Sequence, residues 1–259
     1  MVGGQPGAGK TAAAVQAVRE LMRHGGGVAY INGDELRPFH PQYAALVAAD
    51  RSTATDKTGA DVGLWVERAI REAAAGRFHV VIETTMRQPD VVRRTAEQFT
   101  AQGFGFKLRV VVVDPEASQL GIYERFATGL SSPSALPRFT LLRYHADALA
   151  QMPTTLAGVV KLAKVVRFVD RQGHERYSSM GSKVSPVKAL EGLRRMPLPD
   201  SGRKRIAAQW SSMAQRLDRD GMPNMVRQSV RFEQTRFAAL HEKGRVEASP
   251  APSKNGLER

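Results

Sequence analysis

The residues with the clearest chemical use lie at the start of the sequence, between Gly4 and Thr11. Their order and spacing match G-x-x-x-x-G-K-[ST], a pattern typical of loops that bind phosphate groups. Gly4, Gly7 and Gly9 have no Cβ atom, so the backbone can curl and turn several N–H groups toward one anion. The pattern predicts a nucleotide site formed by Gly4, Gln5, Pro6, Gly7, Ala8, Gly9, Lys10 and Thr11.

Two side chains at the end of this stretch suit the phosphates of ATP. Lys10 can reach the β- and γ-phosphates, and the Thr11 hydroxyl can bind Mg²⁺, so we expect ATP and Mg²⁺ as cofactors. Residues 10–24 are rich in alanine and predict a helix whose positive amino end would also attract phosphate. A glycine-rich turn could match the pattern by chance, but the helix that follows favours a real site.

Carboxylates and an arginine that suit phosphoryl transfer follow two strand-like segments. Asp34 follows residues 28–31, where a base could face the phosphates, although it could instead cap a helix. Glu83 follows residues 78–82 and could organise the water around Mg²⁺. Arg87 comes four residues later and could bind an anionic substrate or form a surface salt bridge.

Two more arginines lie in the middle of the chain. Arg125 falls in a segment with a helical pattern, residues 118–130, and Arg138 falls in the Pro- and Ser-rich loop that follows, residues 131–138. A pair of guanidinium groups could stabilise the charge on a phosphoryl group during its transfer. Each arginine taken alone fits a solvated or structural role better.

The segments between these residues alternate between strand and helix patterns. The predicted strands, which are nearly continuous apolar runs, are residues 28–31, 78–82, 107–113 and 165–169. The predicted helices between them are residues 61–75, 90–102 and 118–130, with Asp61, Asp90 and Ser118 as candidate N-caps. This alternation predicts an α/β fold with a parallel sheet flanked by helices, as in P-loop NTPases, and ligands at the carboxyl ends of the strands.

The two ends of the predicted sheet raise separate questions. A strand normally precedes the phosphate loop and lies centrally in the sheet, but only Met1 and Val2 are present here. We therefore expect either a strand stub or a recorded start that lies inside the true reading frame. After the last predicted strand, residues 171–174 predict a turn, which could form a hairpin with residues 176–177.

Charge is spread unevenly along the 259 residues. Residues 1–159 contain 17 Lys and Arg against 15 Asp and Glu, whereas residues 160–259 contain 21 against 10, so the second part carries +11 of the net +13. Helical patterns in that part cover residues 186–195, 203–217 and 225–242. We expect a P-loop domain at residues 1–195, a basic helical C-terminal extension at 196–245 and a disordered tail at 246–259.

Composition also limits the class and location of the protein. The chain has no cysteine, which excludes disulfides and thiolate metal sites and suits a reducing cytoplasm. There is no apolar run long enough to span a bilayer and no signal peptide before Gly4, so we expect a cytoplasmic protein without membrane contact. The basic second part could attract nucleic acid, but a solvated helical surface explains its charge better.

Several of these segments together resemble the zeta toxin family, whose members are UDP-N-acetylglucosamine kinases. The similarity begins at Gly3 with the phosphate loop and covers about residues 3–195. It then includes Asn32-Gly33-Asp34 with His40-Pro41, Val81-Ile82-Glu83-Thr84-Thr85 with Arg87, Leu120-Gly121-Ile122-Tyr123-Glu124-Arg125-Phe126, and Tyr177-Ser178-Ser179 with Ser185-Pro186. The loop alone is common to many kinases, whereas the whole set in this order is specific.

The resemblance implies that ATP phosphorylates the 3′-hydroxyl of the amino sugar in UDP-N-acetylglucosamine. Asp34 would be the general base, while Lys10 and Thr11 would bind the ATP phosphates and Mg²⁺. The other implied roles are stabilisation of the transferred phosphate by Arg125 and Arg138, a cleft lined by Glu83, Thr85 and Arg87, and contact with the amino sugar or its nucleotide by Glu67 and Thr95. The last two assignments rest on the resemblance alone.

The resemblance also implies a biological role and leaves other interpretations open. The protein would be the toxin of a toxin–antitoxin pair and would be restrained by a small antitoxin protein. Thr84 stands where glycine is common in the family, so we expect a slightly narrower cleft. The alternatives are a kinase of another small hydroxyl substrate such as an antibiotic or a nucleotide, a nucleic-acid-binding protein that uses the basic segment, and a non-catalytic interaction protein.

Overall fold

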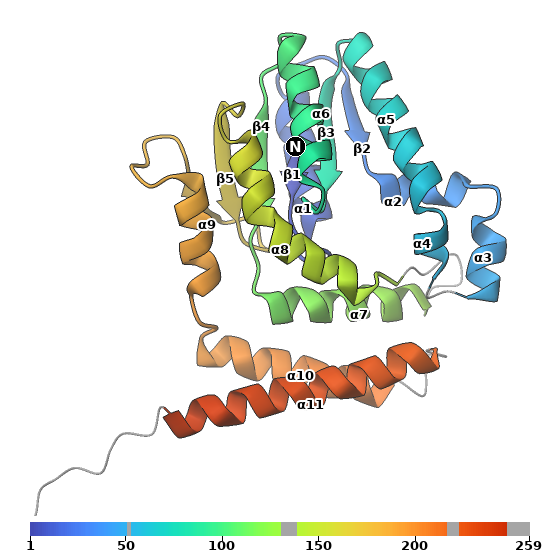
Figure 1. Cartoon of the computed structure of the whole chain (residues 1–259), viewed down its shortest axis with the longest axis vertical. Helices are drawn as coiled ribbons and strands as arrows, with labels where there is room; N and C mark the ends of the chain where they lie inside the picture. Colours follow the sequence, from blue (N-terminus) through green and yellow to red (C-terminus); the bar gives the residue numbers. More distant parts are fainter. Residues whose placement is uncertain (51–52, 131–138, 217–222, 248–259) are drawn as a thin grey trace, which may run out of the picture. The chain divides into compact units, whose positions relative to one another are not determined.

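The computed structural model describes residues 1–50, 53–130, 139–216 and 223–247, with side chains described up to Leu240 (Figure 1). Contacts divide the chain into two units, Met1–Leu198 and Pro199–Arg259, and each is considered by itself. Among the helices in these described ranges, none is long and apolar enough to cross a membrane.

The first unit is built on a six-stranded sheet with the order β2-β3-β1-β4-β5-β6. Its strands are β1 (Val2–Gly3), β2 (Val28–Ile31), β3 (His79–Thr84), β4 (Lys107–Val111), β5 (Val165–Val169) and β6 (Glu175–Ser178). The first five strands run parallel, whereas β6 pairs with β5 in the antiparallel direction. The predicted α/β fold is confirmed, and the turn after β5 leads into a hairpin.

The strand that leads into the phosphate loop is a stub of two residues at the centre of the sheet. Val2 lies opposite Glu83 of β3 on one side and Arg109 of β4 on the other. Main-chain hydrogen bonds continue to Met1, whose α-ammonium donates to the Lys107 carbonyl and whose own carbonyl accepts from the Arg109 N–H. A short strand with partners on both sides therefore anchors the loop.

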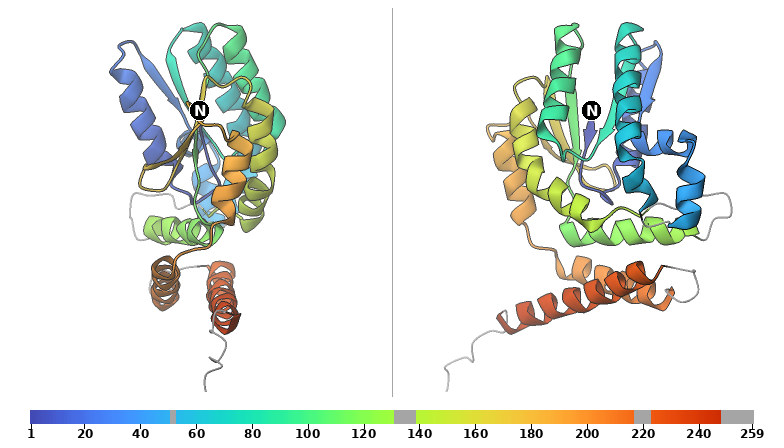
Figure 2. Two further views of the ribbon diagram at one scale, coloured as in Figure 1. Left: turned by 90° about the vertical axis from the view of Figure 1, so that its left-hand side faces the viewer. Right: turned by 45° about the vertical axis from the view of Figure 1, so that its right-hand side comes forward.

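Helices cover both faces of the sheet (Figure 2). They are α1 (Lys10–Met22) on one face and α5 (Gly59–Ala75), α6 (Pro89–Ala101), α8 (Leu142–Val159) and α9 (Pro186–Arg195) on the other. Successive residues of β3 show the division, because Val81 packs with Ala13 of α1. The next residue, Ile82, packs with Ile70 of α5 and Phe99 of α6, as expected where side chains alternate between two buried faces.

The remaining elements of the first unit follow the carboxyl ends of the strands. They are α2 (Gly33–Leu36), the 3₁₀ helix η1 (Arg37–Phe39), α3 (Tyr43–Ala49), α4 (Ala54–Lys57) and α7 (Pro115–Leu130). α7 runs across the ends of the strands (Figure 1). Its buried residues are Ser118, Leu120, Ile122, Tyr123, Phe126 and Ala127. α7 therefore borders the carboxyl edge of the sheet, where ligands are expected to bind.

The starts of three helices differ from the predicted caps. Asp61, Asp90 and Ser118 lie inside helices that begin at Gly59, Pro89 and Pro115. For α7, Asp114 accepts hydrogen bonds from the N–H groups of residues 116 and 117, at 2.8 and 3.3 Å. The predicted caps at Asp90 and Ser118 were wrong because proline, which needs no N–H partner, occupies the first position of both helices.

A cavity of about 610 Å³ lies at the amino edge of the sheet, the edge opposite the phosphate loop. Its walls come from α1, β3, β4 and β5 together with Met1, and they include both apolar residues such as Val80 and Ile82 and cationic ones such as Arg77 and Arg109. β1 pairs with β3 only from Glu83 onward, so the earlier residues of β3 extend past the stub. The space in line with β1 is therefore bordered by backbone on two sides.

In its described residues the second unit contains the helices α10 (Asp200–Arg216) and α11 (Asn224–Glu247), which pack against each other. Their buried apolar residues, spaced by one or two helical turns, are Ile206, Trp210 and Met213 on α10 and Val226, Val230 and Phe237 on α11. The tail expected from residue 246 begins inside α11, and residues 248–259 lie outside the described part of the chain.

Candidate active site

The phosphate loop connects the end of β1 to the start of α1 at the carboxyl edge of the sheet. Gly7 and Gly9 have φ angles of +76° and +92°, in the region that favours glycine. A Cβ atom on Gly7 would come within 1.9 Å of the Ser118 carbonyl oxygen, so no side chain fits there. Gly9 is also the N-cap residue of α1, which aims the amino end of that helix at the loop.

Lys10 is the first residue of α1, and its side chain is buried across the loop. Nζ donates to the Gln5 carbonyl at 3.1 Å, and the Ala8 N–H donates to the same oxygen at 3.2 Å. Thr11 follows in the first turn of the helix and is exposed. A cation inside a curl of glycine backbone, beside an exposed hydroxyl, suits a chain of phosphates.

The same residues fit a metal ion that is bound together with the nucleotide. Within the described ranges, no group of three or more His, Cys, Asp or Glu side chains could hold a metal ion. Mg²⁺ usually keeps several waters and binds through one or two protein groups plus substrate phosphates. The Thr11 hydroxyl at the mouth of the loop supplies one such group, so the site suits Mg²⁺ bound to ATP.

Two long side chains tie the phosphate loop to neighbouring segments, one from within the loop and one from outside it. Gln5 donates from Nε2 to the Val113 carbonyl at 2.8 Å, just beyond β4. Arg171, in the turn between β5 and β6, donates from Nη2 to the Gly7 carbonyl at 2.6 Å and to the Ala117 carbonyl at 3.0 Å. The loop is thereby tied to the neighbouring strand and to α7.

Asp34 lies in α2, the short helix after β2, and its side chain is 30% exposed. The N-cap of this helix is Asn32, whose side chain accepts from the Asp34 N–H at 3.0 Å, so the alternative role of Asp34 as a cap was wrong. The Asp34 carboxylate instead has a guanidinium group on each side. Arg37 Nη2 lies at 3.8 Å and Arg125 Nη1 at 4.0 Å.

Both arginines are also bonded to other segments. Arg37 is buried, and its Nη1 donates to the Thr55 carbonyl and the Thr58 hydroxyl, each at 2.7 Å. Arg125, on α7, donates from Nη2 to the Thr140 hydroxyl at 2.7 Å. These bonds fix the two guanidinium groups, so the carboxylate between them is approached from defined directions.

Glu83 lies near the end of β3 and accepts hydrogen bonds from Tyr30 of the neighbouring strand β2 and from Asn32, which follows that strand. Its Oε2 accepts from the Tyr30 hydroxyl at 2.8 Å and from Asn32 Nδ2 at 3.4 Å. Burial, together with the Glu83 carboxylate, raises the pKa of Tyr30 well above its ordinary value. Tyr30 therefore remains a neutral donor that orients Glu83, while Asn32 connects both to the start of α2.

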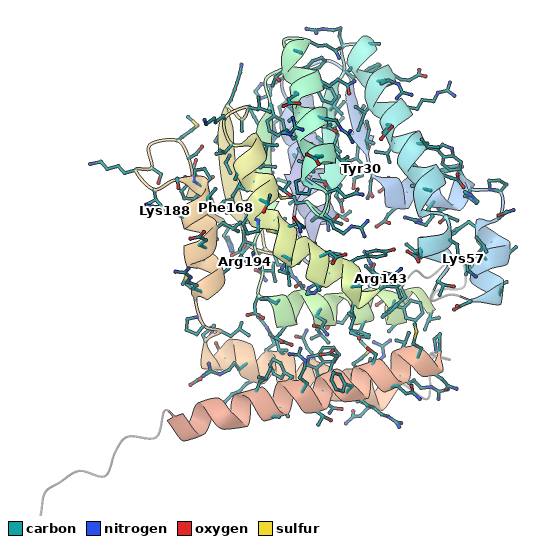
Figure 3. The ribbon with its side chains drawn as sticks, viewed as in Figure 1. Tyr30, Lys57, Arg143, Phe168, Lys188 and Arg194 are labelled. Atoms are coloured by element: carbon teal, nitrogen blue, oxygen red, sulfur yellow. The ribbon has the colours of Figure 1, made fainter. Side chains whose placement is uncertain are left out.

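Arg87 lies three residues after β3 and stacks on an aromatic ring. Its guanidinium carbon is 4.1 Å from the centroid of the Tyr144 ring, and that of Arg143 is 4.8 Å away. Arg143, at the start of α8, also pairs with Asp56 of α4 at 2.8 Å (Figure 3). The Tyr144 hydroxyl donates to the same carboxylate. A cation–π contact with Tyr144 thus holds the Arg87 guanidinium group near this edge.

The other predicted site residues lie in three different settings. Thr85 is half-buried directly after β3, at the carboxyl edge. Glu67 is exposed in the middle of α5, and Thr95 on α6 donates its hydroxyl to the Val91 carbonyl at 2.8 Å. Arg138 lies outside the described residues. The structure therefore brings Thr85 to the edge that carries the loop, whereas Glu67 and Thr95 lie along helices.

Sequence reasoning missed several polar residues of this edge. Arg37 and Arg171 both come shortly after the carboxyl end of a strand, which is the signal that selected Asp34 and Glu83. The same rule applied to every strand would have found both arginines. Tyr30 carries no such signal, because it lies inside a strand and gains its role only from its neighbour in the sheet.

Sequence comparisons match the chain to one family model and to curated relatives that are named as toxins. The family model described as Zeta toxin matches residues 1–181. Among curated relatives, Toxin zeta of Enterococcus hirae is 30% identical over 194 residues, which cover 74% of this chain and 67% of the relative. Toxin PezT of Streptococcus pneumoniae serotype 4 is 30% identical over 126 residues, which cover 49% of each protein.

Structural comparisons agree on the fold. A chain from a study of the PezAT chromosomal toxin–antitoxin system of Streptococcus pneumoniae superposes with a TM-score of 0.66 and 21% identity, over 85% of both chains. A chain of the AvrRxo1-ORF1:-ORF2 complex gives a TM-score of 0.54 and 12% identity, over 91% of this chain and 74% of the other. At these identities the likeness supports the fold alone.

Proposed function

The chain belongs to the zeta toxin family of kinase-type phosphotransferases, and from that premise we propose that it phosphorylates UDP-N-acetylglucosamine. The γ-phosphate of ATP would be transferred to the 3′-hydroxyl of the amino sugar. The observation that carries the proposal is the placement of Asp34 between Arg37 and Arg125, at the sheet edge that also holds the phosphate loop.

The geometry suits an alcohol as the phosphate acceptor. An alcohol is a weak nucleophile at neutral pH, so a carboxylate that takes its proton speeds the attack. In the proposed step, the Asp34 carboxylate accepts the proton, the sugar oxygen bonds to the γ-phosphorus, and ADP leaves with the bridging oxygen. Arg125 lies 4.0 Å from that carboxylate and is placed to stabilise the negative charge on the transferred group.

The phosphate loop would hold ATP for this transfer. Lys10 would bind the β- and γ-phosphates, and Thr11 would bind Mg²⁺, which offsets phosphate charge when it is present. We propose that Arg138 assists Arg125. The proposed acceptor side consists of Glu83, Thr85 and Arg87, with Glu67 and Thr95 in contact with the amino sugar or its nucleotide.

We further propose that the protein acts as the toxin of a toxin–antitoxin pair. Its relatives are named as toxins, and one solved structure comes from a toxin–antitoxin system. Phosphorylation of UDP-N-acetylglucosamine would withdraw a precursor of the cell wall. A small antitoxin protein would then be needed to restrain the enzyme in the cell that makes it.

The test is direct phosphorylation of candidate acceptors. The purified chain is incubated with ATP, Mg²⁺ and a panel of UDP-sugars, a nucleoside and an aminoglycoside, while ADP release is followed. Mass spectrometry should show one added phosphate on UDP-N-acetylglucosamine and none on an analogue that lacks the 3′-hydroxyl. Phosphate found instead on the nucleoside or the antibiotic would replace the proposed acceptor, while leaving the kinase assignment intact.

A further inference from the structure

The first two turns of α7 lie directly against the phosphate loop. A Cβ atom on Gly121 of this helix would come within 2.6 Å of the Gly7 carbonyl oxygen. A Cβ atom on Gly7 would in turn come within 1.9 Å of the Ser118 carbonyl oxygen, so the Gly7 backbone lies directly against Ser118. The loop and α7 therefore pack backbone to backbone, so a shift of the helix is passed directly to the loop.

A buried chain of polar groups crosses this contact. Ser118 is fully buried, and its Oγ accepts a hydrogen bond from Gln5 Nε2 at 3.2 Å. The same oxygen lies 2.8 Å from Nε2 of His145, which is 4% exposed on α8. The Gln5 carbonyl accepts from Lys10 Nζ at 3.1 Å. Contacts thus connect His145, through two intermediates, to the lysine of the phosphate loop.

Ser118 shares its helix with Arg125. The two residues are seven positions apart, which is about two helical turns, so they lie on the same side of α7. Ser118, near the start of α7, contacts the phosphate loop through Gln5. Arg125, two turns later, lies 4.0 Å from the Asp34 carboxylate. The position of α7 against the loop therefore sets the distance between Lys10 and Arg125.

We propose that His145 is a positioning residue that acts through Ser118 to set α7 against the phosphate loop and so place Arg125 relative to Lys10. This inference rests on the proposed function, because it concerns groups that surround the transferred phosphate. Burial and, to a smaller extent, the charge of Lys10 lower the pKa of His145 to about 4. The ring is therefore neutral near pH 7 and can share a hydrogen bond with Ser118 in either tautomer.

A residue that only fills space would respond differently to substitution. Loss of packing lowers the melting temperature but leaves the turnover of the folded protein unchanged. Loss of position lowers turnover, and a displacement of about 1 Å can cost about 100-fold in rate. We therefore expect His145→Met to lower kcat/KM for ATP by about tenfold or more in folded protein. His145→Gln, whose amide can approach the place of Nε2, should recover most of the loss.

The experiment uses the full chain and four variants. These are His145→Met, His145→Gln, Ser118→Ala and the control Leu156→Ala, which empties a buried site on the same helix α8 within the core against the sheet. Steady-state kinetics with ATP and UDP-N-acetylglucosamine, the affinity for a fluorescent ATP analogue and the melting temperature are measured for each. Ser118→Ala removes the shared hydroxyl and should reproduce the kinetic loss of His145→Met with a smaller change in volume.

The control separates stability from positioning. Leu156→Ala should lower the melting temperature at least as much as the His145 variants and keep the wild-type kcat below its melting transition. Wild-type kinetics in both Ser118→Ala and His145→Met would overturn the inference, as would an equal loss in Leu156→Ala. A wild-type chain that binds the ATP analogue but phosphorylates no UDP-sugar would instead overturn the proposed function. In that case the analogue affinity decides the inference: weaker binding by His145→Met than by Leu156→Ala would support it, and equal binding by the two variants would overturn it.

Discussion

Lys10 is the residue whose chemistry is most directly testable. Its ammonium group is buried within the loop and is proposed to neutralise charge that develops on the phosphates during transfer. Lys10→Ala should therefore lower turnover by about 100-fold or more. The control is Lys188→Ala, which removes an exposed ammonium from α9 and should leave turnover unchanged (Figure 3). Turnover close to that of wild type in Lys10→Ala would remove Lys10 from the mechanism.

Asp34 offers the sharpest test of mechanism at a single residue. Asp34→Asn keeps the shape of the side chain and removes its basicity, so sugar phosphorylation should fall by about 10²–10⁴-fold. ATP affinity should stay near wild type, because Lys10, Thr11 and the loop backbone are proposed to hold the nucleotide. Both quantities are measured on one preparation, with the exposed neighbour Glu35→Gln as control. Full activity of Asp34→Asn would exclude Asp34 as the base.

Single residues were predictable where a local pattern selected them. The spacing of the phosphate loop predicted Lys10 at the start of a helix, and the position after a strand predicted Asp34 at the carboxyl edge of the sheet, where the structure has both. The cap of α2 was not identified, because Asn32 and Asp34 are both good capping residues and only the backbone shows which one precedes the helix. The contact of Arg171 with the Gly7 carbonyl could not be predicted, because it joins positions that only the sheet order brings together.

At the scale of elements, the two-residue strand β1 leads to a prediction about the sheet. A variant that carries about three added residues, Val-Leu-Val, directly before Met1 should extend β1 between β3 and β4. By continuation of the register, the added residues would lie opposite residues 79–81 of β3 and occupy the cavity at the amino edge. Burial of each aliphatic side chain contributes about 1.5–3 kcal/mol, and ordering the backbone of each added residue costs about 1–2 kcal/mol, so the melting temperature should rise by several degrees.

The control for this extension is a polar sequence of equal length, Ser-Asp-Ser. It offers the same backbone hydrogen bonds but buries no aliphatic side chain in the cavity, so it should raise the melting temperature less than Val-Leu-Val does. Calorimetry of the three chains distinguishes the outcomes. Equal melting temperatures for all three would show that the stub alone supplies what the sheet requires.

Elements themselves were more predictable than their ends. Apolar runs identified β2, β3, β4 and β5, because buried parallel strands leave a continuous hydrophobic signal. The start of α7 was placed three residues late, because Asp114 caps the helix and Pro115 opens it, whereas Ser118 lies inside its first turn. The periodicity of residues 186–195 predicted α9 with its bounds, since Ser185 caps it and Pro186 opens it.

At the scale of the whole molecule, the chain adds the helices α10 and α11 to the first unit. The excess of basic residues in this part of the chain was evident from the sequence. In its described part the basic segment forms α10 and α11, and Trp210 and Phe237 on these helices are buried. Amphipathic spacing predicted these two helices. Their pairing was not predictable, because both patterns allow several partners for the same apolar stripe.

Global stability should depend on pH through His145. Its pKa is lowered to about 4 in the folded protein from an ordinary value of 6.5, by burial and then by Lys10. Between these values the unfolded chain binds a proton that the folded chain does not, so the free energy of unfolding rises with pH. The contribution is complete above about pH 6.5 and is lost as the pH falls toward 4. The slope for one such group is at most about 1.4 kcal/mol per pH unit.

The difference between two chains isolates this contribution. The Met1 α-ammonium, whose pKa is lowered from 8.0 to about 5 by burial and by Arg109, acts in the same direction between those values. The pH dependence of wild-type stability therefore contains contributions from both groups. The variant His145→Gln keeps the Met1 α-ammonium and removes only the imidazole, so the difference between the two chains reports on His145. Denaturant unfolding from pH 4.5 to 7.5 should show a flatter rise in the variant below pH 6.5 and parallel curves above it. Parallel curves over the whole range would mean that His145 takes up its proton as easily in the folded chain as in the unfolded one.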